Sequence, residues 1–177
     1  ALSTWQPAEG RGLRERILLG PGGIDGAIVL IDETFNANPA SMRAAFEVLA
    51  RSPVEDDIGR VARGRRIAFL GDMLELGPEE TRLHAELAAC AEAEGIDLFH
   101  SCGPRMRAFH EALPRERRGH WAEDSAALAA RAPRLVDAGD VCMVKGSKGS
   151  GMGPVLEAIR RLGSPDPGAR AAPAKET

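Results

Sequence analysis

Short apolar runs alternate with amphipathic segments along the chain. The first run, at residues 27–31, is rich in Ile, Val and Leu, which is typical of a strand buried on both sides. Four later segments have the same character, although the one at 119–122 is weaker. The pattern predicts strands at 27–31, 66–70, 96–100, 119–122 and 141–144.

The segment after the first strand has the pattern of a helix. Asn38 is a favourable N-cap residue, and Pro39 suits the first helical position. The following apolar residues recur at i, i+3, i+4 and i+7, so they share one buried face: Met42, Ala45, Phe46 and Leu49.

Four further helices are predicted by the same reasoning. One covers 79–94 and ends at Gly95, with Leu83, Leu87 and Cys90 facing inward. The next covers 104–113, and another starts after Asp124 and breaks near Pro133, because proline cannot donate the helical hydrogen bond. The last covers 154–162.

Strands that alternate with helices indicate an α/β fold, with a doubly wound, mainly parallel sheet and helices on both faces. Residues 27–162 form this domain. Residues 1–26 contain no predicted strand and are interpreted as the end of a preceding domain together with a linker. Residues 163–177, rich in Pro, Ala and Gly, are interpreted as a mobile tail. In such sheets ligands bind beyond the carboxyl ends of the strands.

The overall composition excludes some partners. The 177 residues carry a net charge of −3, which gives no general attraction to nucleic acid or to a membrane surface. No apolar run approaches the roughly 20 residues of a membrane span. The three cysteines have apolar neighbours, which favours buried thiols in a reducing compartment, and the four histidines are too scattered to predict a metal site.

Polar residues crowd the end of the first predicted strand. Asp32, Glu33 and Asn36 provide two carboxylates and an amide there, and such groups accept hydrogen bonds from ribose hydroxyls. The alternative is structural, with Asp32 bonding to turn amides and Asn38 only capping the helix. We favour a ligand-binding role for Asp32, Glu33 and Asn36, and the capping role for Asn38.

The loop after the second strand, at 70–77, contains two carboxylates, Asp72 and Glu75, together with Leu and Met side chains. Apolar side chains on a loop must be shielded from water by a ligand, by a partner domain or by the core. His84, further along, follows the predicted inward-facing Leu83, and a single histidine in such a position is more often a residue at the edge of the core than a ligand.

The glycine-rich segment 145–153 follows the last strand and precedes a helix. Glycines leave backbone N–H groups accessible, and Lys145 and Lys148 add positive charge beside Ser147, so the segment suits an anion. The alternative is a flexible loop with solvated lysines. The segment does not match the P-loop pattern. Arg11, between two glycines, can reach a phosphate or can belong to a basic linker.

Three of these strings occur in the order and spacing of one known family: DETFNANPASM (32–42), LGDMLELG (70–77) with His84, and VKGSKGSGM (144–152). Together they resemble the Mur ligases of peptidoglycan synthesis, most closely the branch that adds D-Ala-D-Ala to UDP-N-acetylmuramoyl-tripeptide. The resemblance implies the Rossmann-like C-terminal domain of a three-domain enzyme, which closes over ATP and brings the incoming dipeptide.

The resemblance also implies roles for individual residues. The nucleotide would lie near Arg11, Asp32, Glu33 and Asn36. The dipeptide carboxylate or the transferred phosphate would lie near Lys145, Ser147 and Lys148, and a possible substrate loop would include Asp72, Glu75 and His84.

The same resemblance implies a bacterial, cytoplasmic, monomeric enzyme that uses ATP and Mg²⁺ through an acyl phosphate. The phosphate loop, the magnesium ligands and the UDP site belong to the N-terminal and central domains, so this chain alone is expected to be inactive. The family usually has Asp-Asp-Ser-Tyr where this chain has Asp32-Glu33-Thr34-Phe35, and commonly Glu where this chain has Gly153.

Two other functions are compatible with the same fold. One is a domain of another Mur-type or folylpolyglutamate-type ligase that adds a single amino acid. The other is a non-catalytic nucleotide-binding module. The strings Asn-Ala-Asn-Pro and Met-Leu-Glu-Leu-Gly favour the dipeptide-adding branch.

Overall fold

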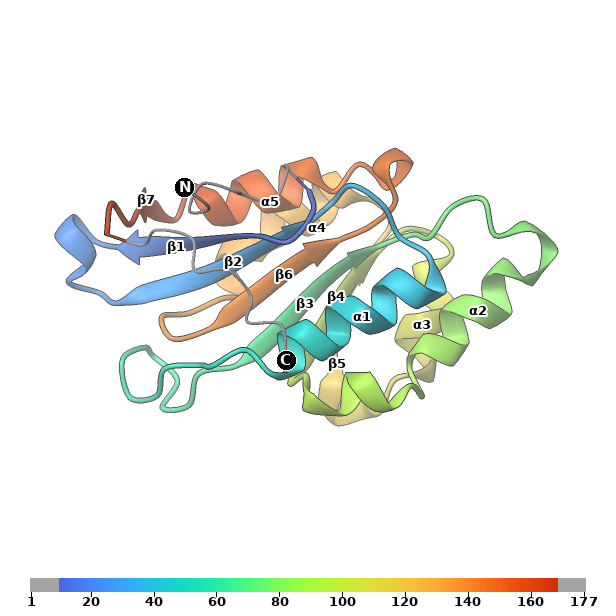
Figure 1. The fold of residues 1–177 in the computed structure, drawn as a ribbon, viewed down its shortest axis with the longest axis horizontal. Helices are drawn as coiled ribbons and strands as arrows, with labels where there is room; N and C mark the ends of the chain where they lie inside the picture. The colour runs from blue at the N-terminus through green and yellow to red at the C-terminus, as the bar shows by residue number, and fades with distance from the viewer. Residues whose placement is uncertain (1–9, 169–177) are drawn as a thin grey trace, which may run out of the picture.

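The computed structural model describes residues 10–168, which form one sheet with helices on both faces (Figure 1). Seven strands lie in the order β5-β4-β3-β6-β2-β1-β7. Their bounds are β1 Leu13–Leu19, β2 Ala27–Glu33, β3 Arg66–Gly71, β4 Leu98–Cys102, β5 Arg118–Ala122, β6 Val141–Lys145 and β7 Gly163–Pro165.

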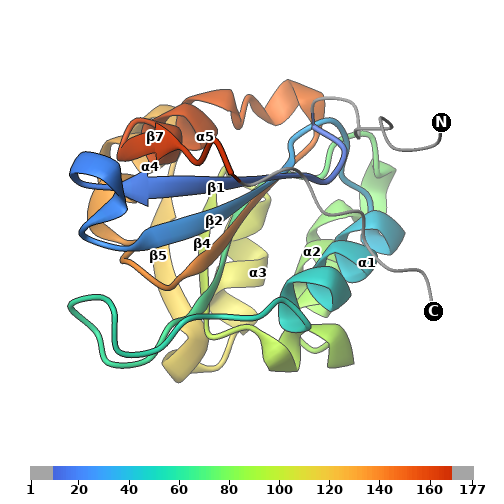
Figure 2. The same cartoon turned by 60° about the vertical axis from the view of Figure 1, so that its left-hand side comes forward.

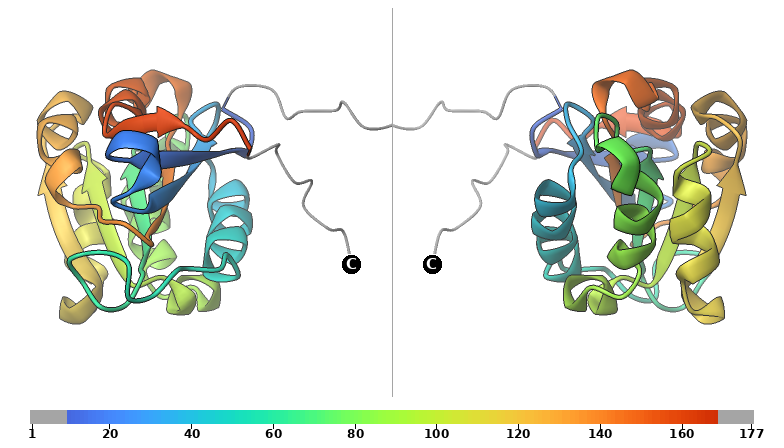
Figure 3. Two further views of the ribbon diagram at one scale, coloured as in Figure 1. Left: turned by 90° about the vertical axis from the view of Figure 1, so that its left-hand side faces the viewer. Right: turned by 90° about the vertical axis from the view of Figure 1, so that its right-hand side faces the viewer.

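The sheet is mainly parallel. The neighbours β2–β6, β6–β3, β3–β4 and β4–β5 pair in parallel, whereas β1 is antiparallel to both β2 and β7. The turned views show helices on both faces of the sheet (Figures 2 and 3). The helices are α1 Pro39–Ala50, α2 Glu80–Leu87, α3 Met106–Ala112, α4 Ser125–Arg131 and α5 Gly153–Arg160. The predicted fold class is confirmed.

A separate apolar core fills each side of the sheet. Side chains of α1, α2 and α3 pack on one face, where Phe99 of β4 makes edge-to-face contacts with Phe46 and Phe109 at 5.4 and 5.3 Å between ring centroids. Side chains of α4 and α5 pack on the other face. Burial on both faces explains why the central strands are almost entirely apolar.

Helix α1 begins as the sequence predicts. The Asn38 side chain accepts a hydrogen bond from the Ser41 N–H at 2.8 Å, and the Ser41 hydroxyl accepts one from the Asn38 N–H at 3.0 Å. This reciprocal capping box satisfies two backbone donors that the helix leaves free. All four residues predicted on its inner face are buried: Met42, Ala45, Phe46 and Leu49.

The predicted helix over 79–94 is wrong in both length and phase. Helix α2 ends at Leu87, and the chain then tightens into i→i+3 hydrogen bonds before a short 3-10 turn, Ala91–Gly95. Gly95 lies so close to Ala50 that a Cβ there would come within 2.6 Å of the Ala50 Cβ, so the turn packs directly on the end of α1. The buried residues of α2 are His84 and Leu87, whereas Leu83 is only half-buried.

Both ends of the predicted domain were placed too far inward. Leu13–Leu19 forms β1, which pairs with β2 along its whole length, so the expectation of no strand before residue 27 is wrong. Gly163–Pro165 forms β7 and pairs with β1, so the start of the predicted tail belongs to the sheet. The remaining parts of those two predictions, 1–9 and 169–177, lie outside the described residues.

Cys102 and Cys142 are buried and Cys90 is half-buried. Burial raises the pKa of the Cys102 thiol to about 12, so the group stays protonated and unreactive at neutral pH. Among residues 10–168, none of the helices has the length and apolar character needed to cross a membrane.

Candidate functional site

The carboxyl ends of the parallel strands carry two pockets, one on each side of the loop after β6. The first has a volume of about 310 Å³ and lies between β2, β6 and the chain entering β1. It brings together four candidate residues from three of the groups that the sequence keeps apart: Arg11, Glu33, Asn36 and Lys145. Its lining is Gly10, Arg11, Glu33, Phe35, Asn36, Ser41 and Lys145.

An arginine stacked on an aromatic ring forms one wall of the first pocket. The Arg11 guanidinium carbon lies 4.0 Å from the centroid of the Phe35 ring, which remains 46% exposed. Gly10 allows this approach, because its backbone has φ +76° and a Cβ there would come within 2.9 Å of the Phe35 nitrogen. A cation over an exposed ring offers a flat surface for a planar, electron-rich ligand.

Asp32 supports the first pocket from beneath. Its carboxylate accepts hydrogen bonds from the N–H and hydroxyl of Thr34, at 3.1 and 2.7 Å, and from the Gly10 N–H at 3.1 Å. Arg160 lies 3.7 Å away, and Asp32 is only 2% exposed. These contacts of Asp32 hold the backbone at Gly10 against the loop after β2.

Lys145 is buried at the base of the same pocket, with 2% of its surface exposed. Its Nζ donates a hydrogen bond to the Asn36 carbonyl at 2.7 Å and lies 3.6 Å from the Glu33 carboxylate. Burial lowers the pKa of Lys145 and raises the pKa of Glu33, although the attraction between the two charges partly offsets both shifts. Lys145 thus ties the loop after β2 to the end of β6.

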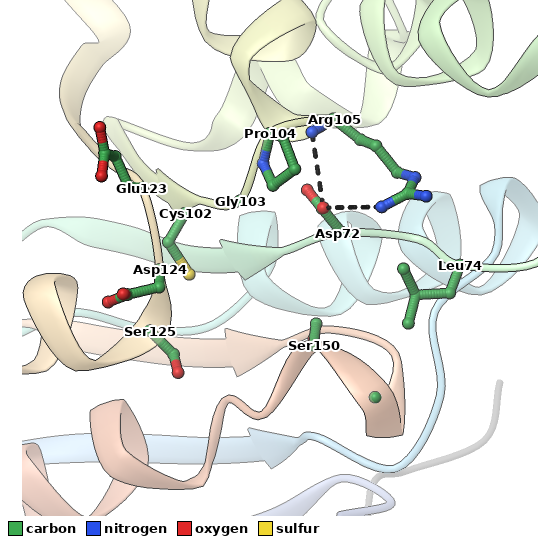
Figure 4. Close-up of a pocket in the computed structure, with 11 residues that line it drawn as sticks. Asp72, Leu74, Cys102, Gly103, Pro104, Arg105, Glu123, Asp124, Ser125 and Ser150 are labelled. Atoms are coloured by element: carbon green, nitrogen blue, oxygen red, sulfur yellow. Dashed lines mark hydrogen bonds and ion pairs between the residues drawn. The ribbon is translucent and has the colours of Figure 1, made fainter.

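The second pocket, of about 230 Å³, lies beyond the ends of β3, β4 and β5 (Figure 4). The Asp72 carboxylate accepts a hydrogen bond from the Met106 N–H at 2.8 Å and lies 3.5 Å from the Arg105 guanidinium. Glu123 and Asp124 line the side of the pocket across from Asp72, and the Asp124 carboxylate accepts a hydrogen bond from the Ala127 N–H at 2.8 Å as the N-cap of α4. Its other lining residues are Leu74, Cys102, Gly103, Pro104, Ser125, Gly149 and Ser150.

Ser147 lies between the two pockets and is 7% exposed, whereas Lys148 is exposed beside it. Glu75 is exposed at the tip of the loop after β3, where its φ of +62° is unusual for a residue with a side chain. His84 is fully buried: one ring nitrogen accepts from the Met73 N–H at 3.0 Å and the other bonds to the Glu80 carbonyl at 2.7 Å. His84 therefore fixes this loop from inside the domain.

Sequence reasoning missed the side chains that follow β4 and β5. The string Cys-Gly-Pro-Arg (102–105) and the acidic pair before α4 stand at strand ends, so their position in the predicted sheet was the available signal. In the sequence Phe35 stands out only as a departure from the family pattern, whereas the structure places its exposed ring in the wall of the first pocket.

The described residues do not suit a divalent metal ion. Among residues 10–168, no three His, Cys, Asp or Glu side chains gather closely enough to hold one. The carboxylates at the site are already bonded to backbone amides, arginines or Lys145, or stand alone at the rim.

This fold and these strand-end loops match a known family. The profile described as Mur ligase, glutamate ligase domain matches residues 22–148, which is more than half of the chain. The chain belongs to the Mur ligase family. It is the C-terminal, glutamate ligase domain of that family, whose members are ATP-dependent and form amide bonds.

Curated relatives of this Mur ligase domain come from distant bacteria. The UDP-N-acetylmuramoyl-tripeptide–D-alanyl-D-alanine ligase of Escherichia coli K12 is 34% identical over 138 residues, which cover 77% of this chain and 28% of that protein. The enzyme of the same name from Mycobacterium tuberculosis H37Rv is 30% identical over 152 residues, or 75% of this chain and 28% of that protein. The chain therefore spans less than a third of these relatives.

Solved structures have the same fold. The MurF ligase of Thermotoga maritima, crystallised with ADP, superimposes with a TM-score of 0.69 at 23% identity, covering 91% of this chain and 33% of that one. A MurF structure from Acinetobacter baumannii gives 0.63 at 24% identity, covering 88% of this chain and 31% of that one.

Proposed function

We propose that this Mur ligase domain is the substrate-capping, C-terminal part of an ATP-dependent ligase that adds D-Ala-D-Ala to UDP-N-acetylmuramoyl-tripeptide. In the complete enzyme, ATP phosphorylates the terminal carboxylate of the tripeptide, the dipeptide amine attacks the acyl phosphate, and phosphate leaves. The main support is the pairing of two pockets on one sheet edge, together with relatives that carry this name.

The first pocket would hold the nucleotide. The ring of Phe35 under Arg11 offers a stacking surface, and the guanidinium offers charge to a phosphate. Glu33 and the exposed side chain of Asn36 line the same space, where a carboxylate and an amide can bond to ribose or base edges. Asp32 contributes by fixing Gly10 and Thr34 rather than by reaching the ligand.

The second pocket and the exposed Lys148 would receive the dipeptide. D-Ala-D-Ala carries one ammonium and one carboxylate, and this end of the sheet offers both signs of charge. Glu123 and Asp124 suit the ammonium, whereas Arg105 and Lys148 suit the carboxylate or the transferred phosphate. Ser147 supports this pocket from below, and Lys145 supports the first pocket, since both are buried and bonded within the domain.

The remaining components of the reaction would come from the preceding domains, namely the phosphate loop, the Mg²⁺ ligands and the UDP-tripeptide site. We expect the complete protein to work as a monomer in the bacterial cytoplasm. A non-catalytic nucleotide-binding module would need the first pocket but would have no use for a second pocket of mixed charge.

A chimera tests the proposed function. The 177-residue chain replaces the corresponding part of the E. coli relative, and phosphate release is measured with ATP and UDP-N-acetylmuramoyl-tripeptide. We expect release only when D-Ala-D-Ala is added, and none from the 177-residue chain alone, because phosphoryl transfer needs a phosphate and metal cradle. Release driven by a single amino acid instead would show that the chain belongs to another branch of the family.

Asn36→Ala in the active ligase should raise the KM for ATP severalfold while leaving the unfolding midpoint of the domain almost unchanged. Asn36 is exposed in the first pocket, and its side chain accepts one bond, from the Ala37 N–H at 2.8 Å. Asn38→Ala is the matched control: it removes the N-cap of α1, so it should cost about 1 kcal/mol of stability with an unchanged KM. The reverse pattern would make Asn36 a structural residue.

A further inference from the structure

Ser147 connects three loops at the carboxyl edge of the sheet. Its hydroxyl donates to the Ala37 carbonyl at 3.2 Å and accepts from the Leu74 N–H at 2.9 Å. Its own N–H donates to the Asp72 carbonyl at 3.1 Å. The Ser147 carbonyl accepts from the N–H and hydroxyl of Ser150, at 2.8 and 2.6 Å. The hydroxyl proton is therefore engaged within the domain, which leaves none for a ligand.

Each partner of Ser147 belongs to, or adjoins, one of the two pockets. Ala37 directly follows Asn36, which lines the first pocket. Asp72, Leu74 and Ser150 all line the second. A single buried side chain therefore joins the walls of two pockets whose residues are far apart in the sequence.

The loops at this junction are packed too closely to move independently. A Cβ on Gly146 would come within 2.4 Å of the Ser150 hydroxyl and 3.2 Å of the Gly71 Cα, so the strand ends of β6 and β3 are in direct contact. Lys145, at the end of β6, makes a second connection by donating a hydrogen bond to the Asn36 carbonyl. A shift of the loop after β2 is therefore passed to the loop after β3 through Ser147, because close-packed elements transmit displacement.

We propose that Ser147 is a positioning residue that couples the two pockets, so that a nucleotide bound at the first pocket changes the backbone around the second. This inference rests on the proposed nucleotide role of the first pocket. By linkage, occupation of the second pocket must affect nucleotide binding to the same extent. Ser147 would then act on the incoming substrate through Leu74 and Ser150, without touching it.

Amide NMR of the 177-residue chain tests the coupling, with ADP as the probe. The variants are Ser147→Ala, which removes only the hydroxyl, and Ser52→Ala, which removes an equally buried hydroxyl bonded to the Val48 carbonyl at the other end of α1. Without ligand, we expect the Leu74 amide to exchange roughly tenfold faster in Ser147→Ala, as for loss of one hydrogen bond, while the Met73 amide is unchanged. Ser52→Ala should leave both amides as in the wild type.

With ADP, the amides of Asn36 and Leu74 should shift together in the wild type and in Ser52→Ala. In Ser147→Ala, the Asn36 amide should still shift, whereas the shift at the Leu74 amide should fall at least severalfold.

A Leu74 shift in Ser147→Ala as large as in the wild type would overturn the coupling and leave the nucleotide pocket standing. Shifts confined to the second pocket, or none at millimolar ADP, would overturn the nucleotide assignment and the coupling with it. If the Leu74 amide of ligand-free Ser147→Ala exchanged at the wild-type rate, the hydrogen-bonded junction at Ser147 would be wrong, whereas the nucleotide assignment would stand.

Discussion

Lys145→Ala is expected to destabilise the domain by about 2–3 kcal/mol. Removing one partner of a fully buried ion pair costs about 3–5 kcal/mol, and the Glu33 side chain, 26% exposed, lowers that figure through solvent screening. The substitution also leaves the Asn36 carbonyl without the hydrogen bond from Nζ. Urea unfolding of the 177-residue chain measures the loss.

The same substitution should raise the KM for ATP in the active ligase severalfold, because Glu33 and Asn36 lose the contacts with Lys145 that hold them in place. The family resemblance of the sequence instead implies an effect on the dipeptide or the transferred phosphate. The geometry moves the expected effect to the nucleotide, since Lys145 holds Glu33 and Asn36 in the first pocket. A change confined to the KM for the dipeptide would restore the original interpretation.

Two variants distinguish the loss of the Lys145–Glu33 ion pair from the general effect of removing a lysine. Lys148→Ala removes an exposed lysine three positions later and should leave stability unchanged. Lys145→Met with Glu33→Gln removes both charges and keeps the volume, so it should recover part of the stability that Lys145→Ala loses. Equal losses for the single and the double variant would mean that the two charges do not interact.

The central strands and the start of α1 could be predicted because local chemistry decides them. The strands are apolar runs buried on both faces, and Asn38 with Pro39 marks a helix start in any context. Strand β1 was missed because three of its seven residues are charged: Arg14, Glu15 and Arg16. Those charges are satisfied only across the fold, by Glu15 with Arg160 and by Arg16 with Glu55 and Asp166. Pairs so distant in sequence leave no local pattern.

The site could be predicted at the level of its loops but not of its contacts. The strand-end rule places Glu33, Asn36 and the lysines of the last loop at one edge of the sheet, where Glu33, Asn36 and Lys145 line one pocket. It could not show that the Ser147 hydroxyl and the His84 ring are bonded to backbone groups of other loops. A polar residue beside a strand end looks the same in sequence whether it faces a ligand or the interior.

His100 is expected to make the domain lose stability as the pH falls from about 6.5 toward 3. The ring is 2% exposed and stacks on Phe69 at 5.0 Å, and Nδ1 accepts a hydrogen bond from the His120 N–H at 2.9 Å. Burial, and then the charges of His120, Arg65 and His110, lower the pKa of His100 to about 3. The folded ring therefore stays neutral while the unfolded one, with an ordinary pKa near 6.5, binds a proton.

The unfolded state then holds more protons below pH 6.5, so the stabilisation that is complete at pH 7 decreases as acid is added. At about 1.4 kcal/mol per pKa unit, the full effect is on the order of 4–5 kcal/mol by pH 3. His100→Asn keeps an acceptor for the His120 N–H without a group that titrates in this range. Urea midpoints at pH 7, 5.5 and 4.5 should therefore fall more steeply in the wild type than in His100→Asn. Since the carboxylates titrate in both proteins, parallel pH curves would mean that His100 is protonated in the folded domain.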